Sequence, residues 1–85
     1  MPVAWGTRPA LLGSGYVLQI KNTSGAVLRI AVKMSDAGGT KSKTFGPLID
    51  PGQTVEINYS NGWPVAPGDH TEITSDGFDP ITIKL

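Results

Sequence analysis

Asp69, His70 and Glu72 lie within four positions of one another and are the side chains in this sequence best suited to chemistry. His70 is the single histidine of the chain, and the three residues follow a Pro-Gly pair in GWPVAPGDHTEI (62–73). Imidazole and carboxylate groups at this spacing are candidate metal ligands or an acid/base pair. Whether they can act together depends on the elements that position them.

A second stretch supplies the frame, because LIDPGQTVEI (48–57) aligns without gaps with PVAPGDHTEI (64–73). In both copies Pro-Gly predicts the centre of a type II turn, followed by an outgoing strand. The alternation then places His70 and Glu72 together on the outer face, about 7 Å apart, and Asp69 is predicted to cap the turn. The residues predicted to point inward are Thr71, Ile73 and Ser75.

Two outward side chains fall short of the three or four ligands that a structural or catalytic metal site needs. The chain has no cysteine and no second histidine to complete such a site. Serines are plentiful, but none lies in a GxSxG motif, and a domain of this size lacks room for a deep pocket. We therefore predict no catalytic residues, no metal site and no cofactor, with a small metal-binding protein around His70 as an alternative.

Length and composition predict one small domain that relies on apolar packing alone. The chain has 85 residues, 39% of them hydrophobic, and no cysteines for disulfides. Residues 1–14 have no signal-peptide pattern and are predicted to be an N-terminal arm or linker before a single domain over 15–85. No apolar run approaches the ~18 residues of a membrane span, so we predict no membrane insertion by this segment.

Charge is balanced overall but divided between the two halves of the chain. Residues 1–50 hold six basic residues against two acidic, whereas residues 51–85 hold one basic against five acidic. Cross-strand pairing between the halves is one explanation, and a polar molecule that docks head to tail is another. The absence of a net positive charge or a dense basic cluster argues against nucleic acid as a partner.

Apolar and polar residues alternate along most of the chain, which predicts short strands. The second predicted strand places Leu28, Ile30, Val32 and Met34 on one face and is expected to pair antiparallel with the first. The third is polar enough for a sheet edge. Asp76-Gly77 is the expected pivot of the last turn. The predicted fold is all-β, an antiparallel immunoglobulin-like β-sandwich of six to seven strands, with a small open barrel as the alternative. The first three strands fall in 15–22, 26–34 and 40–48.

The loop YSNGWPV (59–65) is the candidate ligand-binding surface. Tyr59, Asn61 and Trp63 would bring an aromatic platform and an amide together, a combination that can stack on a sugar ring and bond its hydroxyls. In the alternative, Trp63 folds inward and closes one end of the core. Trp5 would similarly cover an open sheet edge or belong to a linker.

Two sets of motifs resemble known accessory domains. IKNTSGAVLRIAVKM and FGPLIDPGQTVEI resemble bacterial immunoglobulin-like domains of the FxLYD type, and VAPGDHTEITSDGFDPITIKL resembles the closing hairpin of PEGA-type and carboxypeptidase-regulatory-like domains. The resemblance implies an extracytoplasmic spacer or adhesive module within a larger protein. It carries over no catalytic residues.

The sequence thus predicts a non-enzymatic structural or macromolecule-binding module, an accessory or spacer domain whose partner is a protein or a neighbouring domain. A carbohydrate-binding module that uses the 59–65 loop is the first alternative.

Overall fold

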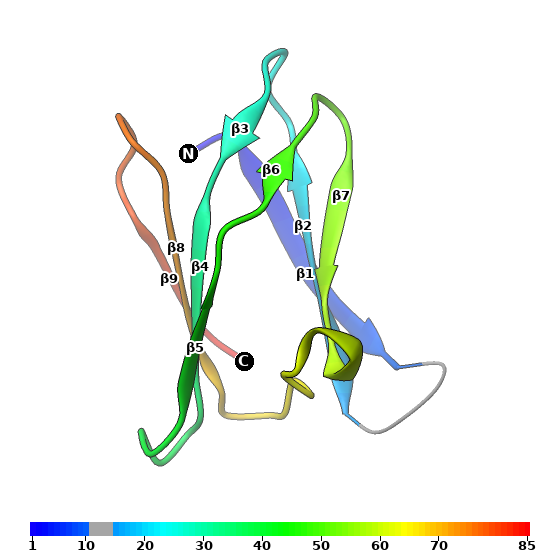
Figure 1. Ribbon diagram of the computed structural model, residues 1–85, viewed down its shortest axis with the longest axis vertical. Coiled ribbons are helices and arrows are strands. Elements are labelled where there is room, and N and C mark those ends of the chain that lie inside the picture. Colours follow the sequence, from blue (N-terminus) through cyan, green and yellow to red (C-terminus); the bar gives the residue numbers. More distant parts are fainter. Residues whose placement is uncertain (11–14) are drawn as a thin grey trace.

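The computed structural model describes residues 1–10 and 15–85, so positions 11–14 of the predicted arm lie outside the described residues. The described chain forms nine short strands and one 3-10 helix, and none of it is α-helical (Figure 1). No helix in these residues is long and apolar enough to cross a membrane. The elements are β1 (Val3–Pro9), β2 (Tyr16–Asn22), β3 (Leu28–Arg29), β4 (Ala31–Ser35), β5 (Ser42–Phe45), β6 (Leu48–Ile49), β7 (Thr54–Ile57), η1 (Tyr59–Asn61), β8 (His70–Thr74) and β9 (Ile81–Lys84).

The strands pair antiparallel throughout and form three sheets. One has the order β1-β2-β7, a second the order β5-β4-β8-β9, and the short pair β3-β6 is the third. Figure 1 shows the two larger sheets as separate layers, with β3 and β6 between them at one end. Among the described residues the sheets do not close into a barrel, because β1, β5 and β9 each pair on one side only.

A single hydrophobic cluster joins the inner faces of all three sheets. The predicted face of the second strand is confirmed, since its four apolar residues are all buried and the lysine between them is exposed. The predicted edge position of the third strand is also confirmed, because β5 is the outermost strand of its sheet and Lys41 and Lys43 are exposed. Each sheet contributes buried hydrophobic residues to this cluster, among them Leu18, Ile20, Leu28, Ile30, Val32, Met34, Ile49, Ile57, Ile73 and Ile83.

The predicted pairing of the first two strands is wrong. β2 pairs with β1 and β7, whereas β4 pairs with β5 and β8. The buried side chain of Asn22 explains the change of direction, because its amide nitrogen donates to the carbonyls of Ala26 (2.7 Å) and Ile49 (2.8 Å). These bonds draw the chain after β2 toward β6 and away from a return alongside β2.

The predicted count of six to seven strands is too low for three reasons. The strand expected at 26–34 is interrupted at Ile30, and a separate short strand, β6, follows β5. In addition, Val3–Pro9 is an edge strand rather than an irregular arm, in register with β2 from Val3↔Asn22 to Pro9↔Tyr16. Gly6 and Pro9 obscured it in the sequence, but an edge strand tolerates proline at its end.

Candidate functional site

Both Pro-Gly turns form as predicted. Gly52 and Gly68 have φ angles of 76° and 92°, the left-handed conformation that glycine adopts without strain. In each turn the residue after glycine donates its N–H to the residue before proline, Gln53 to Asp50 at 3.0 Å and Asp69 to Ala66 at 3.1 Å. Proline before a glycine of positive φ, closed by this bond, is a type II turn.

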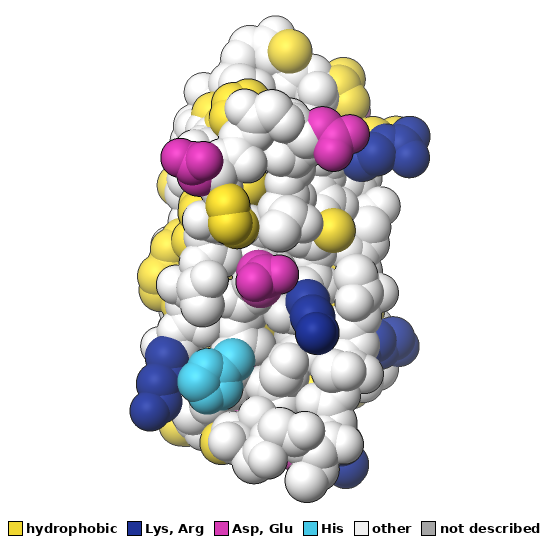
Figure 2. Space-filling view, turned by 90° about the vertical axis from the view of Figure 1, so that its left-hand side faces the viewer, with side chains coloured by type: hydrophobic (Ala, Val, Ile, Leu, Met, Phe, Trp, Pro, Cys, Tyr) yellow, Lys and Arg dark blue, Asp and Glu magenta, His cyan; other side chains and the backbone are white. Residues whose placement is uncertain are grey.

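The strand that leaves the second turn has the predicted faces. His70 and Glu72 are exposed, whereas Thr71 and Ile73 are buried. On the outer face His70 lies opposite Lys84 in β9, and Glu72 lies opposite Lys33 in β4. Figure 2 shows this face, with the histidine among scattered side chains of both charges.

No group of three potential metal ligands occurs among residues 1–10 and 15–85. The hollow beside His70 is a shallow one of about 190 Å³ on the open face of the sheet. This arrangement offers His70 no second imidazole and no enclosing wall.

Asp69 holds the loop that precedes β8. Its Oδ2 accepts the backbone N–H of Ala66 at 2.9 Å, which confirms the predicted turn cap. The same oxygen accepts the indole N–H of Trp63 at 3.0 Å. Asp69 and Trp63 are only 4% and 8% exposed, so this is a buried link between a carboxylate and an aromatic side chain.

The three residues of the predicted platform do not share a surface. Trp63 packs into the hydrophobic cluster, which confirms the alternative in which it closes one end of the core. Asn61 is held in a capping box with Asn58, and its carbonyl accepts the ammonium of Lys43 at 2.9 Å. Tyr59, at 43% exposed, is the one aromatic of this loop that faces solvent.

A different pair of aromatic residues lines a groove that we call the β1–β9 groove. Its volume is about 280 Å³, and it lies between the two edge strands on the open side of the molecule. Trp5 is 46% exposed and Tyr16 is 40% exposed. The groove is lined by Trp5, Thr7, Tyr16, Val65, Ala66, Pro67, Lys84 and Leu85.

Strand register explains why Trp5 points into this groove. Trp5 lies opposite Ile20 and Thr7 lies opposite Leu18, and directly opposed residues of an antiparallel pair share a face. Ile20 and Leu18 point into the core, so Trp5 also faces inward, but from the outermost strand. Among residues 1–10 and 15–85 no further strand pairs with β1 on that side, and the Trp5 side chain forms one wall of the groove.

The opposite wall is attached to the base of β2. The N–H of Tyr16 donates to the carbonyl of Val65 at 2.8 Å and forms an isolated bridge between these residues. Gly15 permits this approach, because a Cβ there would lie 2.6 Å from the same carbonyl oxygen. The loop from Val65 to Pro67 is thereby fixed beside Tyr16, and Asp69 anchors its other end.

The described residues that line the groove are mainly apolar and include one cationic residue and no acidic one. The cationic residue is Lys84, which stands on the outer face of β9 opposite His70 and therefore at the rim. Both flanking strands have hydrogen-bonding partners on one side only in the part of the chain that the structure describes. Alternate backbone N–H and C=O groups of β1 therefore point outward along the groove.

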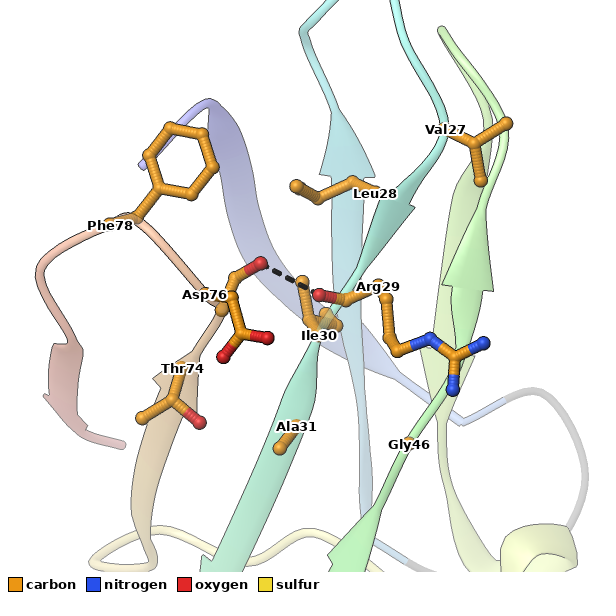
Figure 3. A pocket seen from close by; sticks show the side chains of 10 residues that line it. Val27, Leu28, Arg29, Ile30, Ala31, Gly46, Thr74, Asp76 and Phe78 are labelled. Atoms are coloured by element: carbon orange, nitrogen blue, oxygen red, sulfur yellow. Dashed lines mark hydrogen bonds between the residues drawn. The ribbon is translucent and has the colours of Figure 1, made fainter.

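A second, larger hollow of about 600 Å³ separates β3 from the β8–β9 turn; we call it the β3–β8 cleft. The β4–β8 ladder ends at Ala31↔Thr74, and β3 diverges to pair with β6. Ser75 Oγ spans the gap to the carbonyl of Arg29 at 2.7 Å (Figure 3). Figure 3 shows the Arg29 guanidinium and the Asp76 carboxylate on opposite sides of β3, so the cleft does not bring the two charges together.

The β8–β9 turn itself forms around Asp76-Gly77, as predicted. Phe78 donates its N–H to the carbonyl of Ser75 at 3.2 Å, and Gly77 has a φ of 83°. Beyond this turn Phe78 is 45% exposed and lies between two exposed acidic residues, Asp76 and Asp79. The tip of the hairpin therefore exposes an aromatic ring that directly precedes Asp79 in the sequence, and both Phe78 and Asp76 also line the β3–β8 cleft.

One ion pair joins the two oppositely charged halves of the chain within the described residues. Arg8 bonds Glu56 with a closest approach of 3.0 Å, and the amide of Gln19 donates to the same carboxylate at 2.9 Å. These bonds from Gln19 and then Arg8 lower the pKa of Glu56 below its ordinary value. In the part of the chain that the structure describes, the other acidic residues of the second half form no ion pair, so cross-strand pairing accounts for only part of the charge division.

Asp36 is an acidic residue whose side chain forms hydrogen bonds within the turn at 36–41. Its carboxylate accepts the hydroxyl and N–H of Thr40, both at 2.7 Å, and the N–H of Lys41 at 3.1 Å. The Thr40 hydroxyl and the Lys41 N–H lower the pKa of Asp36.

Comparison with known proteins finds no protein-family model, curated protein or solved structure that matches this chain significantly. The resemblance to immunoglobulin-like accessory domains therefore stays a prediction from the motifs alone. The β1–β9 groove was not predicted from the sequence. Trp5 and Tyr16 come to one face only through the pairing of β1 with β2, and that pairing was not predicted.

Proposed function

We propose that this chain is a non-enzymatic binding module whose β1–β9 groove receives an exposed segment of a protein partner. The proposal rests on one observation: two half-exposed aromatic side chains, Trp5 and Tyr16, line the same groove between two free strand edges. Trp and Tyr contribute large contact areas at low conformational cost and are enriched where proteins bind one another.

The free edges favour a polypeptide over other occupants. The outward backbone groups of β1 repeat at about 3.3 Å per residue, a spacing that an extended peptide matches through its own backbone. β1 carries no lysine, whereas β5 and β9 do, and lysine is a common means of preventing pairing at an edge. The apolar groove beside β1 would hold alternate side chains of the bound segment.

The remainder of the molecule would serve as scaffold. His70 lies on an open sheet face opposite Lys84, and the described residues contain no cluster of three ligands, which supports a role without chemistry. The finer fold assignment, an immunoglobulin-like sandwich within a larger protein, belongs to the same proposal. It is supported by two facing sheets around one core and by the predicted turns.

A carbohydrate is the second candidate ligand, and its site would be the β1–β9 groove rather than the predicted 59–65 loop. Trp63 is buried, so the 59–65 loop offers only Tyr59, whereas Trp5 and Tyr16 remain able to stack on a sugar ring. The shortage of polar side chains in the groove is the argument against it, because sugar recognition also needs hydrogen-bonding groups for the hydroxyls.

Selection of random twelve-residue peptides displayed on phage, against the immobilised full chain, tests the proposal. Enriched peptides should carry an aromatic or aliphatic residue, and Trp5→Ala or Tyr16→Ala should weaken their binding about tenfold or more. Tyr59→Ala is the matched control, since Tyr59 is similarly exposed but does not line the groove, and this variant should bind normally. Failure to enrich any peptide, or loss of binding in Tyr59→Ala alone, would overturn the proposal. A glycan array in parallel detects the carbohydrate alternative.

A further inference from the structure

The hairpin tip and the β1–β9 groove have complementary chemistry on the same chain. The tip presents Phe78 between Asp76 and Asp79, and the groove presents Trp5 and Tyr16 with Lys84 at its rim. An exposed aromatic ring with two acidic residues near it in the sequence suits an aromatic groove whose described lining has one cation and no acidic side chain.

The two surfaces cannot meet within one molecule. The tip and the groove residue Lys84 lie at opposite ends of β9, whose residues Ile81–Lys84 are paired with β8. At about 3.3 Å per residue this strand holds them about 10 Å or more apart. Figure 1 places the β8–β9 turn in the upper part of the molecule and the C-terminus, which lines the groove, in the lower half.

We infer that the partner segment which occupies the groove is the β8–β9 hairpin tip of a second copy of this chain. This inference rests on the proposed function, because it names the occupant of the same groove. The contact is heterologous: the tip of one copy enters the groove of the next, so the pair as a whole keeps one free groove and one free tip. Phe78 packs against Trp5 and Tyr16, and Asp79 or Asp76 pairs with Lys84 of the receiving copy.

Charge favours a second copy as the occupant. Among the described residues neither the two tip carboxylates nor Lys84 takes part in an ion pair within the chain. Head-to-tail contact brings the tip carboxylates of one copy to Lys84 at the groove rim of the next, which pairs opposite charges. The contact area is small, so the association is expected to be weak and dependent on salt.

Sedimentation equilibrium of the full chain over a concentration series tests the inference. The average mass should rise with concentration, and Phe78→Ala or Lys84→Glu should each weaken this association about tenfold or more. Tyr59→Ala is the control for loss of an exposed aromatic and should associate like the wild type.

Mixing the two variants gives the decisive result. Phe78→Ala retains its groove and Lys84→Glu retains its tip, so an equimolar mixture should form a dimer that cannot extend further. A mixture that stays as monomers, while the wild type associates, would overturn the head-to-tail arrangement. Wild-type chains that remain monomeric, while selected peptides still bind the groove, would overturn this inference and leave the proposed function standing. If the groove binds no peptide and the wild type is monomeric, both fail.

Discussion

The indole N–H of Trp63 donates a 3.0 Å hydrogen bond to the carboxylate of Asp69, and both side chains are buried. The same carboxylate oxygen accepts the N–H of Ala66, so one buried group fixes both the aromatic plug of the core and the turn before β8. The loop between them contains Val65 and Pro67, which form a wall of the β1–β9 groove. The shape of the groove therefore depends on this bond.

Asp69→Ala should lower the free energy of unfolding substantially. The substitution leaves the buried indole N–H of Trp63 without its acceptor, which costs about 1–3 kcal/mol, and it also removes the bond to the more exposed N–H of Ala66. Urea denaturation measures the difference. Asp79→Ala, at an exposed position of the same hairpin region, is the control and should change stability by less than about 0.5 kcal/mol.

A double-mutant cycle separates the Trp63–Asp69 bond from the loss of packing. Trp63→Phe, Asp69→Ala and the double variant should show a coupling free energy of about 0.5–3 kcal/mol, as expected for residues in direct contact. Additive effects would mean that the bond does not contribute to stability.

The two tryptophans should differ in fluorescence. Trp5 is half-exposed and Trp63 is buried, so Trp63→Phe should leave an emission that acrylamide quenches readily. Trp5→Phe should leave a blue-shifted emission that resists quenching. Equal quenching of the two single-tryptophan variants in the folded state would contradict the placement of both residues.

The two type II turns allow a matched comparison of glycine substitutions. Gly52→Ala meets nothing within 4 Å, so its cost should be that of the positive φ alone, about 1–2 kcal/mol. Gly68→Ala adds a contact of 3.2 Å with Cβ of Ala37 and should be the more destabilising of the two by thermal denaturation. A neutral Gly52→Ala variant would argue against the type II turn.

Stability should decline in acid partly through Glu56. Gln19 and Arg8 lower the pKa of this carboxyl in the folded state, so its contribution is complete above the ordinary pKa of glutamate, about 4.3. It is lost as the pH falls through the lower, folded-state pKa. Glu56→Gln should therefore lose less stability than the wild type between pH 6 and pH 3, as measured by urea unfolding at each pH. Identical pH profiles would contradict this role.

The sequence predicted the buried face of each strand and the positions of the turns better than it predicted which strands pair with one another. Alternation showed that Val32 and Ile73 point inward, because the side-chain period of a strand is local. The two Pro-Gly turns were predictable for the same reason, since proline and glycine specify the backbone themselves. Which strands pair depends on contacts between residues far apart in the sequence, such as the bond from the buried amide of Asn22 to the carbonyl of Ile49.

The candidate site was the least predictable part. The sequence left two places open for Trp63, the ligand-binding loop surface and the core. In the structure it is buried, and its indole bonds to Asp69, six positions along the chain. Trp5 gained its place in the groove from the register of a strand that Gly6 and Pro9 concealed. Neither fact is encoded in a local pattern.

The most direct test of the groove as a binding site is a ¹H–¹⁵N NMR titration of the full chain with a peptide from the display selection. The chain has two indole N–H groups, one in the groove on Trp5 and one buried against Asp69 on Trp63. The proposal predicts that the Trp5 indole signal and the amides of Tyr16 and Lys84 shift with peptide, while the Trp63 indole signal and the amide of Tyr59 stay in place. Shifts centred on Tyr59, with an unmoved Trp5 indole, would contradict it.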